Sequence, residues 1–229
     1  MEQDPTAAAP RPLIARAFGP ADGGAPEWLV VMLHGVGADG ADLIGLAPIL
    51  AGGMTNALFL APDGPEPCDM APMGRQWFSL ARRDPGALDA GVRRASVDVA
   101  GFVAGELDKA GLGADRLILL GFSQGAMTAL HLALRGAEGP AAAVVALSGM
   151  LLCAHTLADE IRHRPPVLIC HGDADMVVPV SAAGHAGDLL QAAGVPVERH
   201  IVAGLGHGVD DRVIAFIQAF LEHVTGAVS

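Results

Sequence analysis

The chain has 229 residues, of which 52% are apolar and 17% charged. This length suits one domain with a continuous core, and the composition argues against disorder. The formal net charge is 14 − 25 = −11 with no basic cluster, so no nucleic-acid partner is expected, because such a partner requires a cationic surface. No apolar run reaches the roughly 18 residues that would span a bilayer, so stable membrane insertion is not expected either.

From residue 28 onward, short apolar runs alternate with segments of helical periodicity. The predicted strands are 28–33, 57–61, 116–120, 143–147, 167–170 and 197–202, and the predicted helices are 42–50, 88–110, 124–135, 181–193 and 210–224. Most of the runs are continuously apolar, which is typical of parallel strands covered on both faces. The sequence therefore predicts an α/β fold with a mostly parallel central sheet, helices on both faces and no large separate lid domain.

Two parts of the chain stand outside this alternation. Residues 1–24 form an N-terminal segment with a short edge strand expected at 13–18, before a single domain over 25–229. Residues 62–87 contain five prolines and no clear period, together with Met73 and Trp77, which are costly to expose. Long loops in compact domains are usually functional, so this loop either packs over the sheet edge or forms a substrate wall.

The pentapeptide GFSQG at 121–125 follows a predicted strand and precedes a predicted helix. In this context the G-x-S-x-G pattern is a nucleophile elbow, in which a strained turn presents the serine beside a helix N-terminus. Glycines on both sides remove side chains that would collide with neighbouring backbone. We therefore predict that Ser123 is a catalytic nucleophile.

The acid and the base are expected after Ser123, each at the carboxyl end of a later strand. Asp173 and Asp175 both follow the strand at 167–170, and local reasoning separates them only weakly. His207 lies in a glycine-rich loop between the last strand and the last helix. The other late histidines fall inside a predicted strand or helix, so His207 is the predicted base.

The loop after the first central strand, LHGVG at 33–37, is suited to an oxyanion hole. Its glycines permit close approach, and the backbone N–H groups of Val36 and Gln124 are the predicted donors. His171, Asp173 and Asp175 could resemble metal ligands, but the serine machinery accounts for them and no HExxH pattern occurs. No metal and no cofactor are predicted.

The three cysteines indicate a reducing environment. Cys68, Cys153 and Cys170 are odd in number and lack CxxC spacing, and no apolar signal segment follows the acidic N-terminus. We therefore expect a cytoplasmic protein. Cys170 lies within an apolar run, which favours a buried thiol over a nucleophile.

Seven motifs then occur in the order found in the phospholipase/carboxylesterase family, which the chain resembles from residue 28 to the last helix. They are LHGVGADG at 33–40, APD at 61–63, GRQWF at 74–78, GFSQGA at 121–126, LSG at 147–149, HGDAD at 171–175 and GH at 206–207. The resemblance implies Ser123, Asp175 and His207 as the triad, so it selects Asp175 over Asp173. It also implies Val36 and Gln124 as the oxyanion donors.

The resemblance further implies an acyl pocket lined by Trp77, Met73, Leu151 and Leu152. Gln76 departs from the family pattern before the tryptophan, as does the less glycine-rich turn at 126–127, and both bear on acyl-chain preference. Some members of the family dimerise over the site, so a homodimer is one expected state.

The expected function is hydrolysis of esters or thioesters through an acyl-enzyme, as in carboxylesterases, lysophospholipases and acyl thioesterases. The substrate would be a small ester, a lipid or another acylated molecule. The alternative function is a non-catalytic domain of the same fold that binds a small ligand. Such a protein would not need all three members of a triad.

Overall fold

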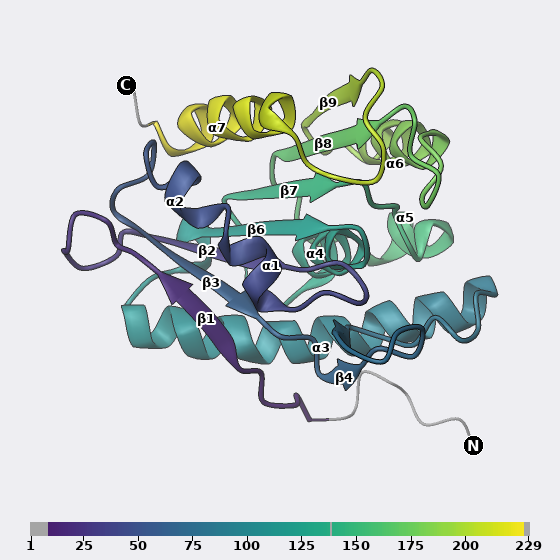
Figure 1. The fold of residues 1–229 in the computed structure, drawn as a ribbon, viewed down its shortest axis with the longest axis horizontal. Coiled ribbons are helices and arrows are strands. Elements are labelled where there is room, and N and C mark those ends of the chain that lie inside the picture. Colours follow the sequence, from purple (N-terminus) through teal and green to yellow (C-terminus); the bar gives the residue numbers. More distant parts are fainter. Residues whose placement is uncertain (1–8, 138, 227–229) are drawn as a thin grey trace.

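The computed structural model describes residues 9–137 and 139–226, in which a seven-stranded sheet has the order β1-β3-β2-β6-β7-β8-β9 (Figure 1). Its strands are β1 (Ala15–Phe18), β2 (Trp28–Leu33), β3 (Ala57–Pro62), β6 (Leu117–Phe122), β7 (Ala143–Leu147), β8 (Val167–Gly172) and β9 (Val197–Val202). Only β1, the expected edge strand, pairs antiparallel; the other neighbours are parallel. The predicted α/β fold with a mostly parallel sheet is confirmed.

Helices cover both faces of the sheet (Figure 1). They are α1 (Gly40–Ile44), α2 (Ala47–Leu50), α3 (Pro85–Ala110), α4 (Gln124–Arg135), α5 (Leu157–Glu160), α6 (Ser181–Ala192) and α7 (Asp211–Thr225), with short 3₁₀ turns at Ala114–Arg116 and Ala154–Thr156. No described helix is long and apolar enough to cross a membrane.

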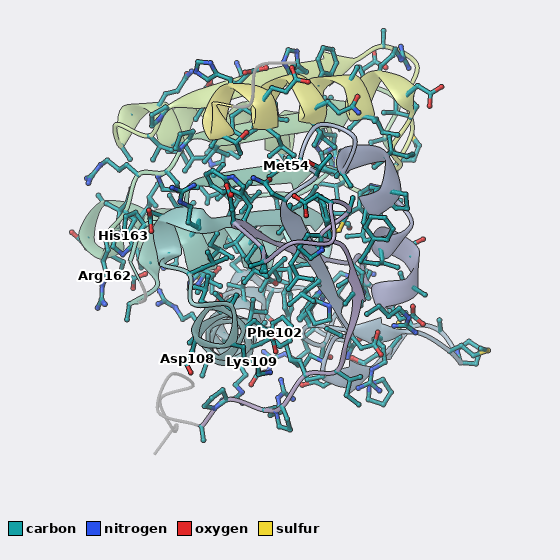
Figure 2. All side chains as sticks on the ribbon, turned by 90° about the vertical axis from the view of Figure 1, so that its left-hand side faces the viewer. Met54, Phe102, Asp108, Lys109, Arg162 and His163 are labelled. Carbon is teal, nitrogen blue, oxygen red and sulfur yellow. The ribbon has the colours of Figure 1, made fainter. Side chains whose placement is uncertain are left out.

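The core has two halves, one on each face of the sheet, and side chains fill the space on both sides (Figure 2). Along β2, Leu29, Val31 and Leu33 belong to the apolar cluster that includes residues of α3, α4 and α6, whereas the residues between them belong to the cluster that includes residues of α1, α2 and α7. Because both faces are covered, every residue of β2 is buried. Burying each such side chain contributes roughly 1.5–3 kcal/mol, which explains the continuous apolar runs.

Two predicted helices differ from the observed ones. The helix expected at 42–50 is two helices. Helix α1 ends at Ile44 with Gly45 as its C-cap, and Pro48 lies in the first turn of α2, where its missing N–H costs nothing. Helix α3 begins at Pro85, three residues earlier than expected. The Asp84 side chain caps it by accepting a hydrogen bond from the backbone N–H of Ala87 at 3.0 Å.

The loop expected at 62–87 is partly ordered into a two-stranded antiparallel ribbon. Strands β4 (Glu66–Pro67) and β5 (Arg75–Gln76) pair with each other rather than with the main sheet. No helix occurs between β3 and α3, whose intervening residues are all described. This ribbon lies against the loop that follows β2, as the hydrogen bonds described below show.

Candidate active site

Ser123 stands alone in the turn between β6 and α4. Its backbone angles are φ 53° and ψ −115°, a conformation that costs an ordinary residue about 1–3 kcal/mol. The turn is compact: a methyl group at Gly125 would lie 1.9 Å from the carbonyl oxygen of Leu33, and one at Gly121 would lie 2.4 Å from the Gly125 carbonyl group. Glycine is therefore required at both positions for the chain to adopt this turn.

His207 and Asp175 are joined directly. Nδ1 of His207 lies 2.7 Å from Oδ2 of Asp175, while Oδ1 of Asp175 accepts hydrogen bonds from the N–H groups of Val177 and Val178 at 2.8 and 2.9 Å. Burial alone would raise the pKa of the Asp175 carboxyl, but these hydrogen bonds outweigh it and hold the pKa below its ordinary value. Because the carboxylate accepts, Nδ1 of His207 carries the proton and Nε2 is left with a free lone pair, as the predicted base requires.

The imidazole of His207 lies beside the nucleophile turn. Its ring centroid is 4.8 Å from that of Phe122, the residue that precedes Ser123. Within the described residues no hydrogen bond joins the Ser123 hydroxyl to His207. Such bonds often tighten only when substrate is bound. The structure thus places the predicted base near the predicted nucleophile, without a hydrogen bond between His207 and the Ser123 hydroxyl.

Asp173, the competing acid, occupies a different position. Its Oδ1 accepts a hydrogen bond from the N–H of Gly204 at 2.6 Å, and its own N–H donates to Val202 at 3.1 Å. Asp173 thus fixes the start of the loop that carries His207, whereas Asp175 contacts the His207 ring itself. The two roles separate the two candidates.

The predicted oxyanion loop lies next to the serine. A methyl group at Gly35 would be 3.4 Å from Cβ of Ser123. Among the described residues, the N–H groups of Val36 and Gln124 have no acceptor, so both are free to bind a developing oxyanion.

The ribbon formed by β4 and β5 fixes this loop through backbone hydrogen bonds. Gly37 donates to the Arg75 carbonyl at 2.8 Å, and Arg75 donates to Ala38 at 2.8 Å. The Arg75 side chain in turn donates to the carbonyl groups of Gly64 and Pro65 at 2.7 and 2.9 Å. The proline-rich segment therefore braces the loop that follows β2, the predicted oxyanion loop.

Trp77 corrects one expectation of the sequence. It was expected to line an acyl pocket, but its side chain has no exposed surface, and its indole N–H donates to the carbonyl of His34 at 2.8 Å. Its backbone N–H donates to the side chain of Gln124 at 2.8 Å, which itself donates to Phe78 at 2.7 Å. Trp77 therefore joins the turn at Ser123 to the loop after β2: its backbone bonds to Gln124, and its indole bonds to His34.

His34 is also enclosed in this network. Its Nε2 accepts a hydrogen bond from Gly64 at 2.8 Å, so Nδ1 carries the proton and lies 2.7 Å from the carbonyl oxygen of Gly35. Burial lowers the pKa of His34, which keeps it neutral. It therefore braces the loop that follows β2.

The other predicted pocket residues lie in two settings. Met73 is 80% exposed near the β5 side of the ribbon, whereas Leu151 and Leu152 are each 7% exposed and belong to the core on the α3 and α4 face. The segment before them is close to the elbow, since a methyl group at Gly149 would lie 3.3 Å from the Ser123 carbonyl oxygen. Contact between these residues and a substrate remains a prediction.

His171 has a place in the site that the sequence did not reveal. It is fully buried at the end of β8; its Nε2 lies 2.9 Å from the carbonyl oxygen of Val178 and 3.3 Å from Oδ2 of Asp175. It therefore packs against the same oxygen of Asp175 that His207 contacts. The available clue was a histidine at the end of an apolar strand, which was interpreted only as a possible metal ligand and as part of the HGDAD motif.

Cys153 and Cys170 are buried free thiols. Burial raises the pKa of the Cys153 and Cys170 thiols to about 12, so neither is a ready nucleophile. Within residues 9–137 and 139–226, no three His, Cys, Asp or Glu side chains gather as metal ligands would.

A strained serine between a parallel strand and a helix, with a histidine and a carboxylate on later strand ends, defines a member of the α/β-hydrolase fold class. The sequence model of the phospholipase/carboxylesterase family matches residues 21–225. The chain therefore belongs to the phospholipase/carboxylesterase family, the esterase and acyl-protein thioesterase family within that class. The prediction of an ester hydrolase is confirmed at this level.

Individual relatives support the same placement. The chain is 30% identical to esterase YpfH of Escherichia coli (strain K12), over 83% of this chain and 80% of that protein. It is 28% identical to acyl-protein thioesterase 1 homolog 1 of Dictyostelium discoideum, over 84% and 88% of the two chains. The crystal structure of esterase PE8 superposes with a TM-score of 0.88 at 38% identity, covering 93% of this chain and 99% of that one.

Proposed function

We propose that this chain is a serine hydrolase that cleaves carboxylic esters or thioesters through an acyl-enzyme on Ser123. The observation that carries the proposal is the strained backbone of Ser123 at the start of α4, beside a histidine whose Nδ1 is held by Asp175 at 2.7 Å. Strained backbone in a residue other than glycine is concentrated at functional sites, and at Ser123 it coincides with this histidine and carboxylate.

The protonation states support a defined sequence of proton transfers. Nε2 of His207 takes the Ser123 proton as Oγ attacks the carbonyl carbon, and Asp175 stabilises the imidazolium that forms. The imidazolium then protonates the leaving alcohol or thiol, which departs and leaves the acyl group on Oγ. Water, deprotonated by His207, attacks this ester and restores the free Ser123.

The negative charge of each tetrahedral intermediate would fall on the carbonyl oxygen. The unpartnered N–H groups of Val36 and Gln124 are the donors for it, and each such donor contributes about 3–4 kcal/mol in comparable sites. The positions of these two donors depend on Trp77 and on the β4–β5 ribbon, which brace the loop. We propose that this brace maintains the rate of hydrolysis as well as the fold.

We propose an acyl substrate, either a small ester or a lipid or other acylated molecule. Relatives named as an esterase and as acyl-protein thioesterases support both leaving-group classes. The Leu151–Leu152 side chains and the exposed Met73 are the proposed acyl contacts. We further propose a cytoplasmic location, which is supported by three free cysteines.

The first test is covalent labelling. A fluorophosphonate probe should label Ser123, and Ser123→Ala and His207→Ala should each abolish hydrolysis of p-nitrophenyl acetate. A folded protein that is neither labelled nor active would instead support the alternative of a ligand-binding domain.

A matched pair of variants tests the acid. Asp175→Asn should lower kcat by roughly 10³–10⁴-fold, while Asp173→Asn, which changes a carboxylate two residues away, should lower it less than tenfold. Circular dichroism on both proteins separates catalysis from folding. A larger loss in Asp173→Asn would overturn the assignment.

The substrate class needs a separate experiment. Esters and thioesters with acyl chains of two to sixteen carbons, compared by kcat/KM, would define the chain length and leaving group. The same series measured on Leu152→Ala and Met73→Ala would show whether these side chains contact the acyl chain. Unchanged length preference in both variants would remove them from the pocket.

A further inference from the structure

His171, at the end of β8, is a buried histidine to which the proposed mechanism gives no role. Its side chain has no exposed surface, and its Nε2 lies 2.9 Å from the carbonyl oxygen of Val178. Because a carbonyl oxygen can only accept, Nε2 carries a proton and donates this hydrogen bond. The other ring nitrogen, Nδ1, is also buried and has no hydrogen-bond partner among the described residues.

A histidine is costly at this place in the strand. The residues before it, Val167–Cys170, are all buried and form an apolar run. A buried ring nitrogen without a partner has lost its bonds to water, a cost that an apolar side chain would not carry. Such atoms are rare in folded proteins and each requires an explanation. The contacts of Nε2 supply one.

Nε2 of His171 faces the predicted acid as well as Val178. It lies 3.3 Å from Oδ2 of Asp175, whose side chain also has no exposed surface. Nδ1 of His207 lies 2.7 Å from the same Oδ2. The carboxylate oxygen that bonds to His207 therefore has the N–H group of a second histidine beside it, and this group attracts the negative charge of the oxygen.

His171 also holds the turn that follows the acid. Val178 donates its N–H to Oδ1 of Asp175 at 2.9 Å, and its carbonyl accepts from His171. The turn has little cover from outside, because Met176 and Val177 are 94% and 67% exposed. Within the part of the chain that the structure describes, His171 and Asp175 are the two side chains that hydrogen-bond to the backbone of residues 176–178.

We propose that His171 is a positioning residue, whose Nε2–H group holds Val178 and Oδ2 of Asp175 so that the carboxylate stays directed at Nδ1 of His207. This inference rests on the proposed function. Two backbone N–H groups fix Oδ1 of Asp175, and His171 limits the movement of Oδ2. Without its N–H group the carboxylate and the turn can shift, and His207 loses the orientation that a general base requires.

Two substitutions at this position test the proposal. In methionine and in glutamine the ε atom is as many bonds from Cα as Nε2 is in histidine, but only glutamine carries an N–H donor there. His171→Met should lower kcat on p-nitrophenyl acetate by about 10–100-fold, with KM changed less than about threefold, because the base is misplaced while the substrate contacts remain. His171→Gln should recover most of the lost kcat.

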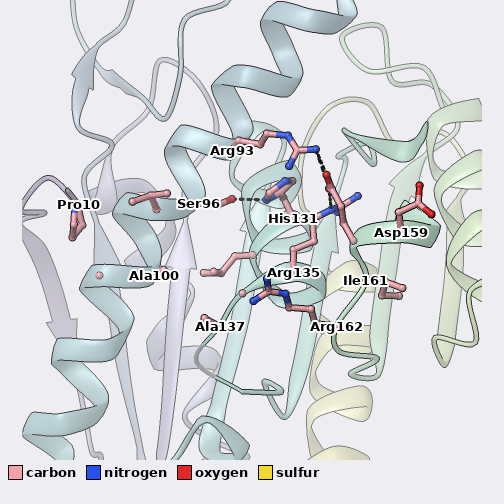
Figure 3. Close-up of a pocket in the computed structure, with 15 residues that line it drawn as sticks. Pro10, Arg93, Ser96, Ala100, His131, Arg135, Ala137, Asp159, Ile161 and Arg162 are labelled. Carbon is pink, nitrogen blue, oxygen red and sulfur yellow. Dashed lines mark hydrogen bonds and ion pairs between the residues drawn. The ribbon is translucent and has the colours of Figure 1, made fainter. Parts of the chain in front are cut away.

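His131→Met is the matched control, since it removes another buried histidine on a different element. His131 lies on α4 in the wall of a pocket between α3 and residues 159–162, and its Nδ1 is 2.9 Å from the Ser96 hydroxyl oxygen (Figure 3). Burial and the Arg135 guanidinium lower its pKa to about 3, so methionine removes an imidazole but no charge. His131→Met should leave kcat unchanged, and urea denaturation of all three variants records any loss of stability.

A double variant separates positioning from folding. If His171 acts through Asp175, His171→Met should lower the residual kcat of Asp175→Asn by less than about twofold, because residues that act as a unit are not additive. A contribution to folding alone would lower kcat by the same factor in both backgrounds. Should His171→Met not fold, His171→Asn, whose amide ends one bond short of Nε2, replaces it in the comparison with His171→Gln.

Three results would overturn the inference: a wild-type kcat in the folded variant without the donor, no recovery in His171→Gln, or equal losses with and without Asp175. Activity that survives Ser123→Ala would instead overturn the proposed function. If Ser123→Ala is inactive and His171→Met is fully active, the proposed function stands and the role of His171 does not.

Discussion

Gly125→Ala is the substitution that most directly tests how the turn at Ser123 positions the proposed oxyanion donors. The added methyl group would lie 1.9 Å from the Leu33 carbonyl oxygen and 2.7 Å from that of His34. Ordinary contact begins at 3.4 Å, so the chain must separate by roughly 1.5 Å. Both atoms are backbone, at the end of β2 and the start of the oxyanion loop, so no side-chain rotation can relieve the contact.

The expected effects follow from that displacement. Overpacking of this kind costs about 1–3 kcal/mol of stability, and a displacement of about 1 Å in a catalytic group can cost about 10²-fold in rate. We therefore expect kcat on p-nitrophenyl acetate to fall by at least about 10²-fold with KM changed less. Urea denaturation of the same samples measures the stability cost.

Gly105→Ala is the matched control. Gly105 lies inside α3 with nothing within 4 Å of the added methyl group, so alanine should stabilise the protein by about 0.5–1 kcal/mol and leave kcat unchanged. If folded Gly125→Ala retained kcat within threefold of the wild type, the inferred dependence of the oxyanion hole on this close approach would be wrong.

Two further predictions concern stability. Trp77→Phe should lower the unfolding free energy by about 1–3 kcal/mol in urea denaturation, because the buried His34 carbonyl loses its N–H donor. Its kcat should fall by more than its KM changes. A variant as stable as the wild type would contradict the role of Trp77 as a brace. Burial would raise the pKa of Glu160, but hydrogen bonds, first among them that of Arg93, lower it to about 2 from 4.5. The stabilisation by ionised Glu160 is complete above about pH 4.5 and is lost as the pH falls toward 2. Glu160→Gln should therefore cost about 1 kcal/mol of unfolding free energy at pH 7. Between pH 4.5 and pH 2, the unfolding free energy of this variant should decline less steeply than that of the wild type.

The sequence was most informative where a local pattern determines the structure. Continuous apolar runs predicted the parallel strands because both faces of the sheet are covered, and the glycines around Ser123 predicted the turn because only glycine fits there. Strand-end positions then limited the base to His207. These features depend on a residue and its near neighbours in the chain.

The sequence was least informative where a partner from elsewhere in the chain decides the role. Trp77 could be a pocket wall or a brace until its contact with His34, 43 residues away, is known. Asp173 and Asp175 share one loop, and only the position of the His207 ring separates them. His131 is one more polar residue on a predicted helix until Ser96 and Arg135 are placed around it.

The enclosure of Trp77 has a spectroscopic consequence. The chain has two tryptophans and no tyrosine, and the other, Trp28, lies at the far end of β2 with the Arg116 guanidinium 4.9 Å from its ring. In a Trp28→Phe variant, all indole emission would come from a ring without exposed surface, 5.2 Å from the His34 imidazole. Its emission wavelength and lifetime would report the order of the loop after β2 during the proposed acylation, without an added label.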